Sequence, residues 1–91
     1  MIYKLTFTRD AEKILAKYKK SNPRFFKKLR DLLHDLEEHP YTGIGHPEPL
    51  VGGNNITYSR RIGKSDRIIY NIYDDAIMVL VLTIEGHYGD K

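Results

Sequence analysis

The pattern of apolar and polar positions in residues 2–7 has a period of two. Tyr3, Leu5 and Phe7 point to one side, and the polar residues between them point to the other. Such alternation is typical of a strand with one buried face. The pattern therefore predicts a half-buried strand at residues 2–7.

The next apolar pattern has the period of a helix. Its stripe recurs at i, i+3, i+4 and i+7 and consists of Ala11, Ile14, Leu15 and Tyr18. Thr8 or Asp10 can accept hydrogen bonds from the first free N–H groups of this helix. The sequence predicts a first helix that begins near Thr8.

A second helix follows after a short interruption. Asn22 is a suitable N-cap, and Pro23 suits the first helical turn. The apolar stripe of this helix consists of Phe26, Leu29, Leu33 and Leu36. We expect the helix to run to about Glu38, because His39-Pro40 ends it. Two helices joined by so short a turn predict an antiparallel hairpin.

Glycine and proline residues are frequent in the region after Pro40, which predicts a loop there. Strand patterns follow this loop. Strands are predicted at Ile56–Ile62, Arg67–Tyr73 and Ala76–Leu82, with a turn at Asp74-Asp75. The last run is almost wholly apolar, so we expect a central strand that is buried on both faces. The chain is thus predicted to be one α+β domain spanning residues 1–91. Its architecture is an antiparallel sheet of four or five strands with an N-terminal helical hairpin packed on one face.

Composition excludes several classes of protein. The chain has no cysteine, so disulfides and thiolate metal sites are excluded. Its longest apolar run, Ala76–Leu82, is too short for a membrane span, which needs about 20 residues. We expect a cytoplasmic protein without a membrane anchor. Fifteen basic and 12 acidic residues give a formal charge of +3, which favours an anionic partner.

Glu48 and two arginines are the first candidates for chemistry. Glu48 lies between two prolines, which stiffen the backbone that aims its carboxylate. If Arg61 pairs with Arg67, residues 62–66 form a five-residue loop and both guanidinium groups share one face, ready to bind a phosphate. A four-residue loop, 63–66, would instead pair Arg61 with Ile68 and separate the arginines. The sequence leaves both registers open.

His87-Tyr88 completes a set that is suited to cutting RNA without a metal or cofactor. The ribose 2′-OH must lose a proton as it attacks the phosphorus, and the leaving 5′-oxygen must gain one. Glu48 is the candidate base, His87 the candidate acid, and Arg61 and Arg67 the candidate cations for the charged transition state. Tyr88 offers a hydroxyl for phosphate and a ring for a base.

The segments that carry these residues closely resemble the YoeB/Txe toxins of the RelE superfamily. They are Gly43-Ile44-Gly45-His46-Pro47-Glu48-Pro49-Leu50, Tyr58-Ser59-Arg60-Arg61-Ile62, Asp66-Arg67-Ile68-Ile69-Tyr70 and His87-Tyr88. The resemblance implies a RelE-like fold and a ribosome-dependent mRNA endoribonuclease of a type II toxin–antitoxin system. The family's base falls on Glu48, its arginines on Arg61 and Arg67, its acid on His87 and its terminal tyrosine on Tyr88.

The resemblance also implies partners. These are a cognate antitoxin whose disordered tail folds over the active site, a ribosome with bound mRNA, and operator DNA reached only through the antitoxin. A homodimer is a further possibility for this family. We add Tyr58, Arg60 and His46 as further candidates for substrate binding. His46 stands where family members often have lysine, and Val51 stands at a second such position.

Two alternatives stay open on the sequence alone. One is a toxin of the same fold that inhibits DNA gyrase, like the ParE toxins, and the other is a degenerate module that docks on the ribosome without cutting. The presence of both Glu48 and His87 favours the nuclease.

Overall fold

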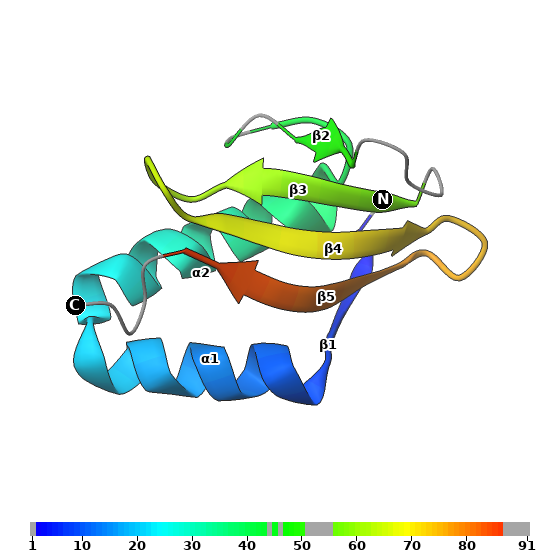
Figure 1. The fold of residues 1–91 in the computed structure, drawn as a ribbon. Coiled ribbons are helices and arrows are strands. Elements are labelled where there is room, and N and C mark those ends of the chain that lie inside the picture. Colours follow the sequence, from blue (N-terminus) through cyan, green and yellow to red (C-terminus); the bar gives the residue numbers. More distant parts are fainter. Residues whose placement is uncertain (1, 44, 46, 51–55, 87–91) are drawn as a thin grey trace.

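The computed structural model describes residues 2–43, 45, 47–50 and 56–86. In these residues one strand and two helices are followed by four strands (Figure 1). The bounds are β1 Lys4–Phe7, α1 Arg9–Ser21, α2 Pro23–Glu38, β2 Glu48–Pro49, β3 Thr57–Arg61, β4 Arg67–Tyr73 and β5 Met78–Glu85. The predicted order of elements is confirmed. Neither of these helices combines the length and the apolar character that crossing a membrane requires.

Local hydrogen bonds explain where the two helices begin and end. The Thr8 hydroxyl accepts the Ala11 N–H at 3.1 Å, so Thr8 and not Asp10 caps α1. Asn22 ends α1, because its N–H donates to the Tyr18 carbonyl, and its side chain accepts the Phe25 N–H at 3.2 Å to begin α2. One residue therefore forms the whole turn of the helical hairpin.

The sheet has five strands in the order β1-β5-β4-β3-β2. Strands β2 to β5 form the predicted antiparallel ladder, but β1 pairs parallel with β5, from Lys4 opposite Met78 to Phe7 opposite Val81. The sheet is therefore mixed and not wholly antiparallel. The apolar pattern cannot reveal this difference, because side chains alternate in the same way in parallel and antiparallel strands.

Strand β5 differs from its predicted form in position and in burial. Residues 74–77 form the turn before it, and the Ile77 N–H donates to the Asp74 carbonyl at 3.1 Å, so the strand begins at Met78 and runs to Glu85. It is central, as expected. It is not buried on both faces, however, because its fully buried positions, such as Val79 and Val81, lie on the face that the helices cover.

The hydrophobic core fills the space between the helical hairpin and one face of the sheet. Both helices contribute to it, and so do alternate positions of β4 and β5. Its members include Ile14, Tyr18, Leu29, Leu32, Leu36, Ile68, Tyr70, Ile72, Val79, Val81 and Ile84. Because neighbouring residues of a strand point to opposite sides, Arg67, Ile69 and Asn71 lie on the other face, which we call the open face.

Candidate active site

Arg61 and Arg67 lie directly opposite each other at one end of the open face. The register of β3 and β4 pairs Arg61 with Arg67, and both side chains are exposed. The turn between them is the five-residue loop 62–66, which the Ile62 N–H closes by donating to the Asp66 carbonyl at 2.9 Å. Of the two registers that the sequence allowed, the structure has the one that brings the arginines together.

Glu48 lies on the same face as the arginine pair. Strand β2 places Glu48 opposite Ser59, two residues before Arg61 on the same side of β3. Diagonal neighbours in an antiparallel pair are about 7–8 Å apart. The Glu48 side chain is exposed, and Pro47 and Pro49 flank it. The structure therefore brings three of the predicted site residues to one end of one face.

Glu85 is a neighbour of the arginine pair that the sequence analysis missed. Strand β5 places Glu85 opposite Arg67, on the side away from Arg61. Oppositely charged side chains at such positions attract each other. Three other candidates, His46, His87 and Tyr88, lie outside the described residues.

Asp66 is a second residue that the sequence analysis left without a role. A Cβ atom added at Gly86 would overlap the Asp66 carboxylate, so this side chain packs directly on the backbone that leads to residue 87. Only glycine permits so close an approach. The turn between the two arginines therefore contacts the end of β5.

Arg60 has the opposite environment from Arg61. Its side chain is fully buried, and its guanidinium group donates to the Asp35 carboxylate at 2.7 Å and to the carbonyls of His39 at 2.5 Å and Thr42 at 2.8 Å. A side chain with no exposed surface cannot contact a substrate. The expected role of Arg60 in substrate binding is therefore corrected: it holds the loop after α2.

This loop closes tightly around the buried ion pair. A Cβ atom added at Gly43 would overlap the Asp35 carboxylate, and one at Gly45 would lie 2.6 Å from Cγ of Arg60. Both glycines have positive φ angles, 106° and 86°. The Gly45 carbonyl also accepts the Arg61 N–H at 2.7 Å. The two glycines thus let the chain pass the ion pair and reach β2, where Glu48 lies.

Tyr58 belongs to the core side of the sheet. It shares the Arg60 side of β3 and packs against the core. Its ring stacks on Tyr70 at a centroid distance of 6.2 Å and meets the edge of Tyr41 at 5.4 Å. The structure does not bring Tyr58 to the arginine pair. Burial raises the pKa of the neighbouring Tyr70 hydroxyl, although Arg60 opposes this effect.

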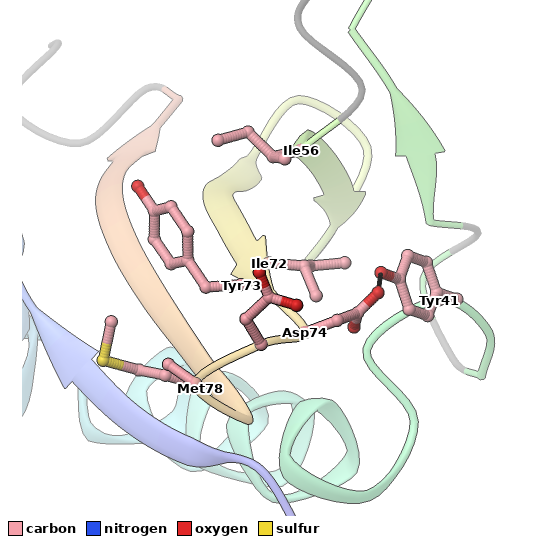
Figure 2. A pocket seen from close by; sticks show the side chains of 8 residues that line it. Tyr41, Ile56, Ile72, Tyr73, Asp74 and Met78 are labelled. Atoms are coloured by element: carbon pink, nitrogen blue, oxygen red, sulfur yellow. Dashed lines mark hydrogen bonds between the residues drawn. The ribbon is translucent and has the colours of Figure 1, made fainter.

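A cavity of about 510 Å³ lies at the other end of the sheet, near the β4–β5 turn (Figure 2). Its walls include Ile56, Ile72 and Met78. Beside it the Tyr41 hydroxyl donates to Asp74 at 2.6 Å, which raises the pKa of Tyr41 and lowers that of Asp74. None of the predicted site residues that the structure describes lines this cavity. The seven residues of β4 separate it from Arg67 by about 20 Å.

Potential metal ligands do not gather in the described part of the chain. No group of three or more His, Cys, Asp or Glu side chains there is placed to hold a metal ion. The groups that the structure does bring together are two guanidinium groups and the carboxylates of Glu48 and Glu85. A carboxylate accepts protons, and guanidinium groups bind phosphate oxygens in a bidentate manner.

Comparisons with known proteins identify relatives of this chain. A family model described as YoeB-like toxin of bacterial type II toxin–antitoxin system matches residues 7–88. The toxin YoeB of Streptomyces coelicolor is 30% identical over 77 residues, which are 85% of this chain and 92% of that protein. The solved YoeB dimer of Staphylococcus aureus superposes with a TM-score of 0.81 at 26% identity, covering 97% of this chain and 100% of that one. A YoeB–YefM complex from Staphylococcus aureus gives a TM-score of 0.77 at 27% identity with the same coverage.

Proposed function

The chain belongs to the YoeB-like toxins of bacterial type II toxin–antitoxin systems, and from this premise we propose that it is an endoribonuclease that cuts messenger RNA on the ribosome. The observation that carries the proposal is the shared position of Glu48, Arg61 and Arg67 at one end of the open face. A gyrase inhibitor has no need of a proton acceptor beside two phosphate-binding groups.

Glu48 acts as the general base in the proposed reaction. It removes the proton from the ribose 2′-OH, whose oxygen then forms a bond to the adjacent phosphorus. The bond from phosphorus to the 5′-oxygen breaks, and His87 gives that oxygen a proton. The products are a 2′,3′-cyclic phosphate and a 5′-hydroxyl end. Each positioned acid or base contributes about 10²- to 10⁴-fold to the rate.

Arg61 and Arg67 stabilise the charge that gathers on the phosphorane-like transition state. Two exposed guanidinium groups at opposing positions repel each other, and a phosphate between them turns this repulsion into attraction. Tyr88 completes the set by contacting the phosphate or a base. Because side chains supply the base, the acid and the cations, the reaction needs no metal ion. DNA lacks the 2′-OH and is not a substrate.

The ribosome positions the substrate. The chain carries a formal charge of only +3, so it grips free RNA weakly. A bound A-site codon already has a fixed position, and fixing the reacting groups lowers the barrier to reaction. The toxin therefore acts in the cytoplasm, where its substrate is found.

A cognate antitoxin is the proposed inhibitor. The relatives with solved structures include a YoeB–YefM toxin–antitoxin complex and a YoeB dimer. We expect an acidic, initially disordered segment of the antitoxin to fold over the arginine pair, because complementary charge favours such binding. Operator DNA is reached only through the antitoxin, and the free toxin can form a homodimer, as the solved YoeB of Staphylococcus aureus does.

Primer extension on a defined mRNA in a reconstituted translation system tests the proposal. Wild type should cut at the A-site codon, whereas Glu48→Gln and His87→Ala should not. The same mRNA without ribosomes should be cut far more slowly. Growth inhibition without any cleavage, retained in both variants, would instead indicate gyrase as the target, which a supercoiling assay then checks.

A further inference from the structure

Two carboxylates flank the arginine pair, one on each side. Strand β3 places Arg61 opposite Arg67, and strand β5 places Glu85 opposite Arg67 on the far side. Glu48, on β2, is the diagonal neighbour of Arg61. All four side chains are exposed, and the end of β5 lies beside the β3–β4 turn (Figure 1). The charges across the sheet are therefore negative, positive, positive and negative, and the proposed reaction uses all of them except that of Glu85.

Glu85 is close to Arg67 without occupying it. Side chains at directly opposed positions have Cβ atoms about 4.5–5.5 Å apart. Among the described residues, however, no ion pair joins Arg67 to Glu85. The donors of the Arg67 guanidinium group therefore remain available to a phosphate. A phosphate bound there lies within about one side-chain length of the Glu85 carboxylate, which repels it.

The fold gains little from a glutamate at this position. Glu85 is the last residue of β5, and its side chain is exposed and outside the hydrophobic core. Glutamate is less favourable in strands than β-branched or aromatic residues. An exposed pair of opposite charges also contributes little to stability. The main effect of Glu85 is therefore on the group that Arg67 binds.

The size of this effect depends on the charge of the bound group. An internal phosphodiester of RNA carries one negative charge, whereas a terminal phosphate carries about −1.5 to −2 at pH 7. Coulomb repulsion is proportional to the charge of the ligand. Glu85 therefore disfavours a terminal phosphate almost twice as strongly, in free energy, as it disfavours a phosphodiester. Other charges near the arginine pair do not alter this ratio.

We propose that Glu85 is a specificity-determining residue, which shifts the preference of the arginine pair from terminal phosphates towards the internal phosphodiesters of RNA. This inference rests on the proposed function, since it names the charge state of the phosphate that the same site accepts. Free nucleotides and phosphorylated RNA ends are anions that two unopposed guanidinium groups bind well. A negative charge beside Arg67 keeps such anions from occupying the site.

Recognition of a base is a less suitable role for Glu85. A glutamate can accept hydrogen bonds from the amino group of a base. Bases of single-stranded RNA are usually recognised while they stack on an aromatic ring or a guanidinium plane. Among the described residues, the neighbours of Glu85 on the open face of β4 and β5 are Arg67, Ile69 and Thr83. None is aromatic, and the guanidinium group binds phosphate in the proposed reaction.

Two variants that each remove one exposed negative charge test the proposal. Glu85→Gln removes it beside Arg67, and Asp75→Asn removes it in the β4–β5 turn, at the other end of β5. The probes are a 2′-O-methylated dinucleoside monophosphate, which has one phosphodiester and cannot be cleaved, and the corresponding nucleoside 3′-monophosphate. NMR titration of the full chain near pH 7.5 measures both affinities, so the result does not depend on cleavage.

Glu85→Gln should raise the affinity for the phosphodiester about 3-fold and that for the monophosphate about 10-fold, as expected for one unit charge about 7 Å away in water. Asp75→Asn should change neither affinity appreciably. Equal gains for the two ligands, no gain for either, or the same gains in Asp75→Asn overturn the proposal. Unchanged binding in Arg67→Gln would place the ligands elsewhere and overturn it as well.

Two further comparisons separate this proposal from its alternatives. An effect of Glu85→Gln that depends on whether the ligand carries guanine or uracil assigns Glu85 to base recognition and overturns charge selection. If wild type cuts no mRNA on the ribosome but Glu85→Gln still shifts the preference, the proposed function fails and the role of Glu85 at the phosphate site stands. If the mRNA is cut and the preference does not shift, the role of Glu85 fails alone.

Discussion

Arg60 and Arg61 are adjacent in the sequence and differ in almost every structural respect. Arg60 points to the helices, is fully buried and binds one carboxylate and two carbonyls. Arg61 points to the open face, is exposed and stands opposite a second arginine. Strand alternation alone places one in the core and the other on the open face, where we propose that it binds phosphate. The two residues are of the same type, so their different environments follow from the face of β3 to which each side chain points.

The two arginines also differ in what their removal leaves behind. Around Arg60 the partners are fixed and close, and its Nε atom is the single buried side-chain polar atom without a hydrogen bond in the described structure. Around Arg61 the partners are solvent and another cation. The buried guanidinium group is thus enclosed by fixed acceptors, whereas the exposed one is accessible to solvent.

Replacement of the buried arginine should have the largest effect. Arg60→Met keeps a long side chain but leaves Asp35 and two backbone carbonyls without their donor, which costs about 3–5 kcal/mol of unfolding free energy. Urea denaturation measures the loss. Arg61→Met is the matched control and should change stability by less than about 0.5 kcal/mol. Equal stability of the two variants would refute the contrast between the buried and exposed sites.

Replacement of an exposed arginine should affect activity and not stability. Arg67→Gln should slow cleavage of ribosome-bound mRNA by about 10²- to 10³-fold, the usual cost of removing one group that stabilises transition-state charge. Lys64→Gln removes the same charge from the turn between the arginines and should leave the rate within a few-fold of wild type. Similar rates in the two variants would contradict a specific role for the arginine pair.

The loop around Arg60 should tolerate very little change. Gly43→Ala places a Cβ atom on the Asp35 carboxylate at a φ angle of 106°, which costs about 1–2 kcal/mol or more in stability. Because the loop leads to Glu48, the cleavage rate should also fall. Gly63→Ala is the control, since its Cβ atom would meet neighbours at the ordinary distances of 3.5 and 3.9 Å. A stable, active Gly43→Ala would show that the ion pair does not position Glu48.

The smallest effect should come from Asp74, the exposed counterpart of Asp35. Hydrogen bonds from Tyr41 and Tyr3 lower the pKa of Asp74. A carboxylate with a lowered folded-state pKa stabilises the fold above its unfolded pKa of about 3.9 and loses this effect as pH falls through the folded value. Tyr41→Phe should therefore lower the free energy of unfolding at pH 6. The difference in this free energy between the variant and wild type should become smaller below pH 4. Midpoints of urea denaturation across this pH range measure the difference in stability. A difference that does not change with pH would contradict a link between the lowered pKa of Asp74 and stability.

Local chemistry allowed much of the fold to be predicted. The caps Thr8 and Asn22, the end of α2 and the bounds of β4 follow from short-range patterns. The parallel pairing of β1 could not be predicted in this way, because side chains alternate identically whichever direction the neighbouring strand runs. The start of β5 was misplaced because Ala76 and Ile77 are apolar, although they form part of a turn.

The candidate site was predicted in residue type but not in register. Glu48, Arg61 and Arg67 were named from their chemistry, and the tertiary structure decided that they share a face. The sequence carries no clear signal for the register. Asp35 binds Arg60 at 2.7 Å, but Asp31 also directly precedes an apolar residue of α2 and is exposed, so the pattern alone does not show which carboxylate faces the sheet.

The strand order has a consequence for the synthesis of the protein. Strand β1 pairs with β5 alone, and β5 is the last described strand to be made although it lies between β1 and β4. A nascent chain that stops at the β4–β5 turn therefore has no partner for its first strand, and its helices have only part of a sheet to cover. Contacts between distant segments form late and slowly. The growing chain should therefore complete its sheet and its core only after β5 has emerged.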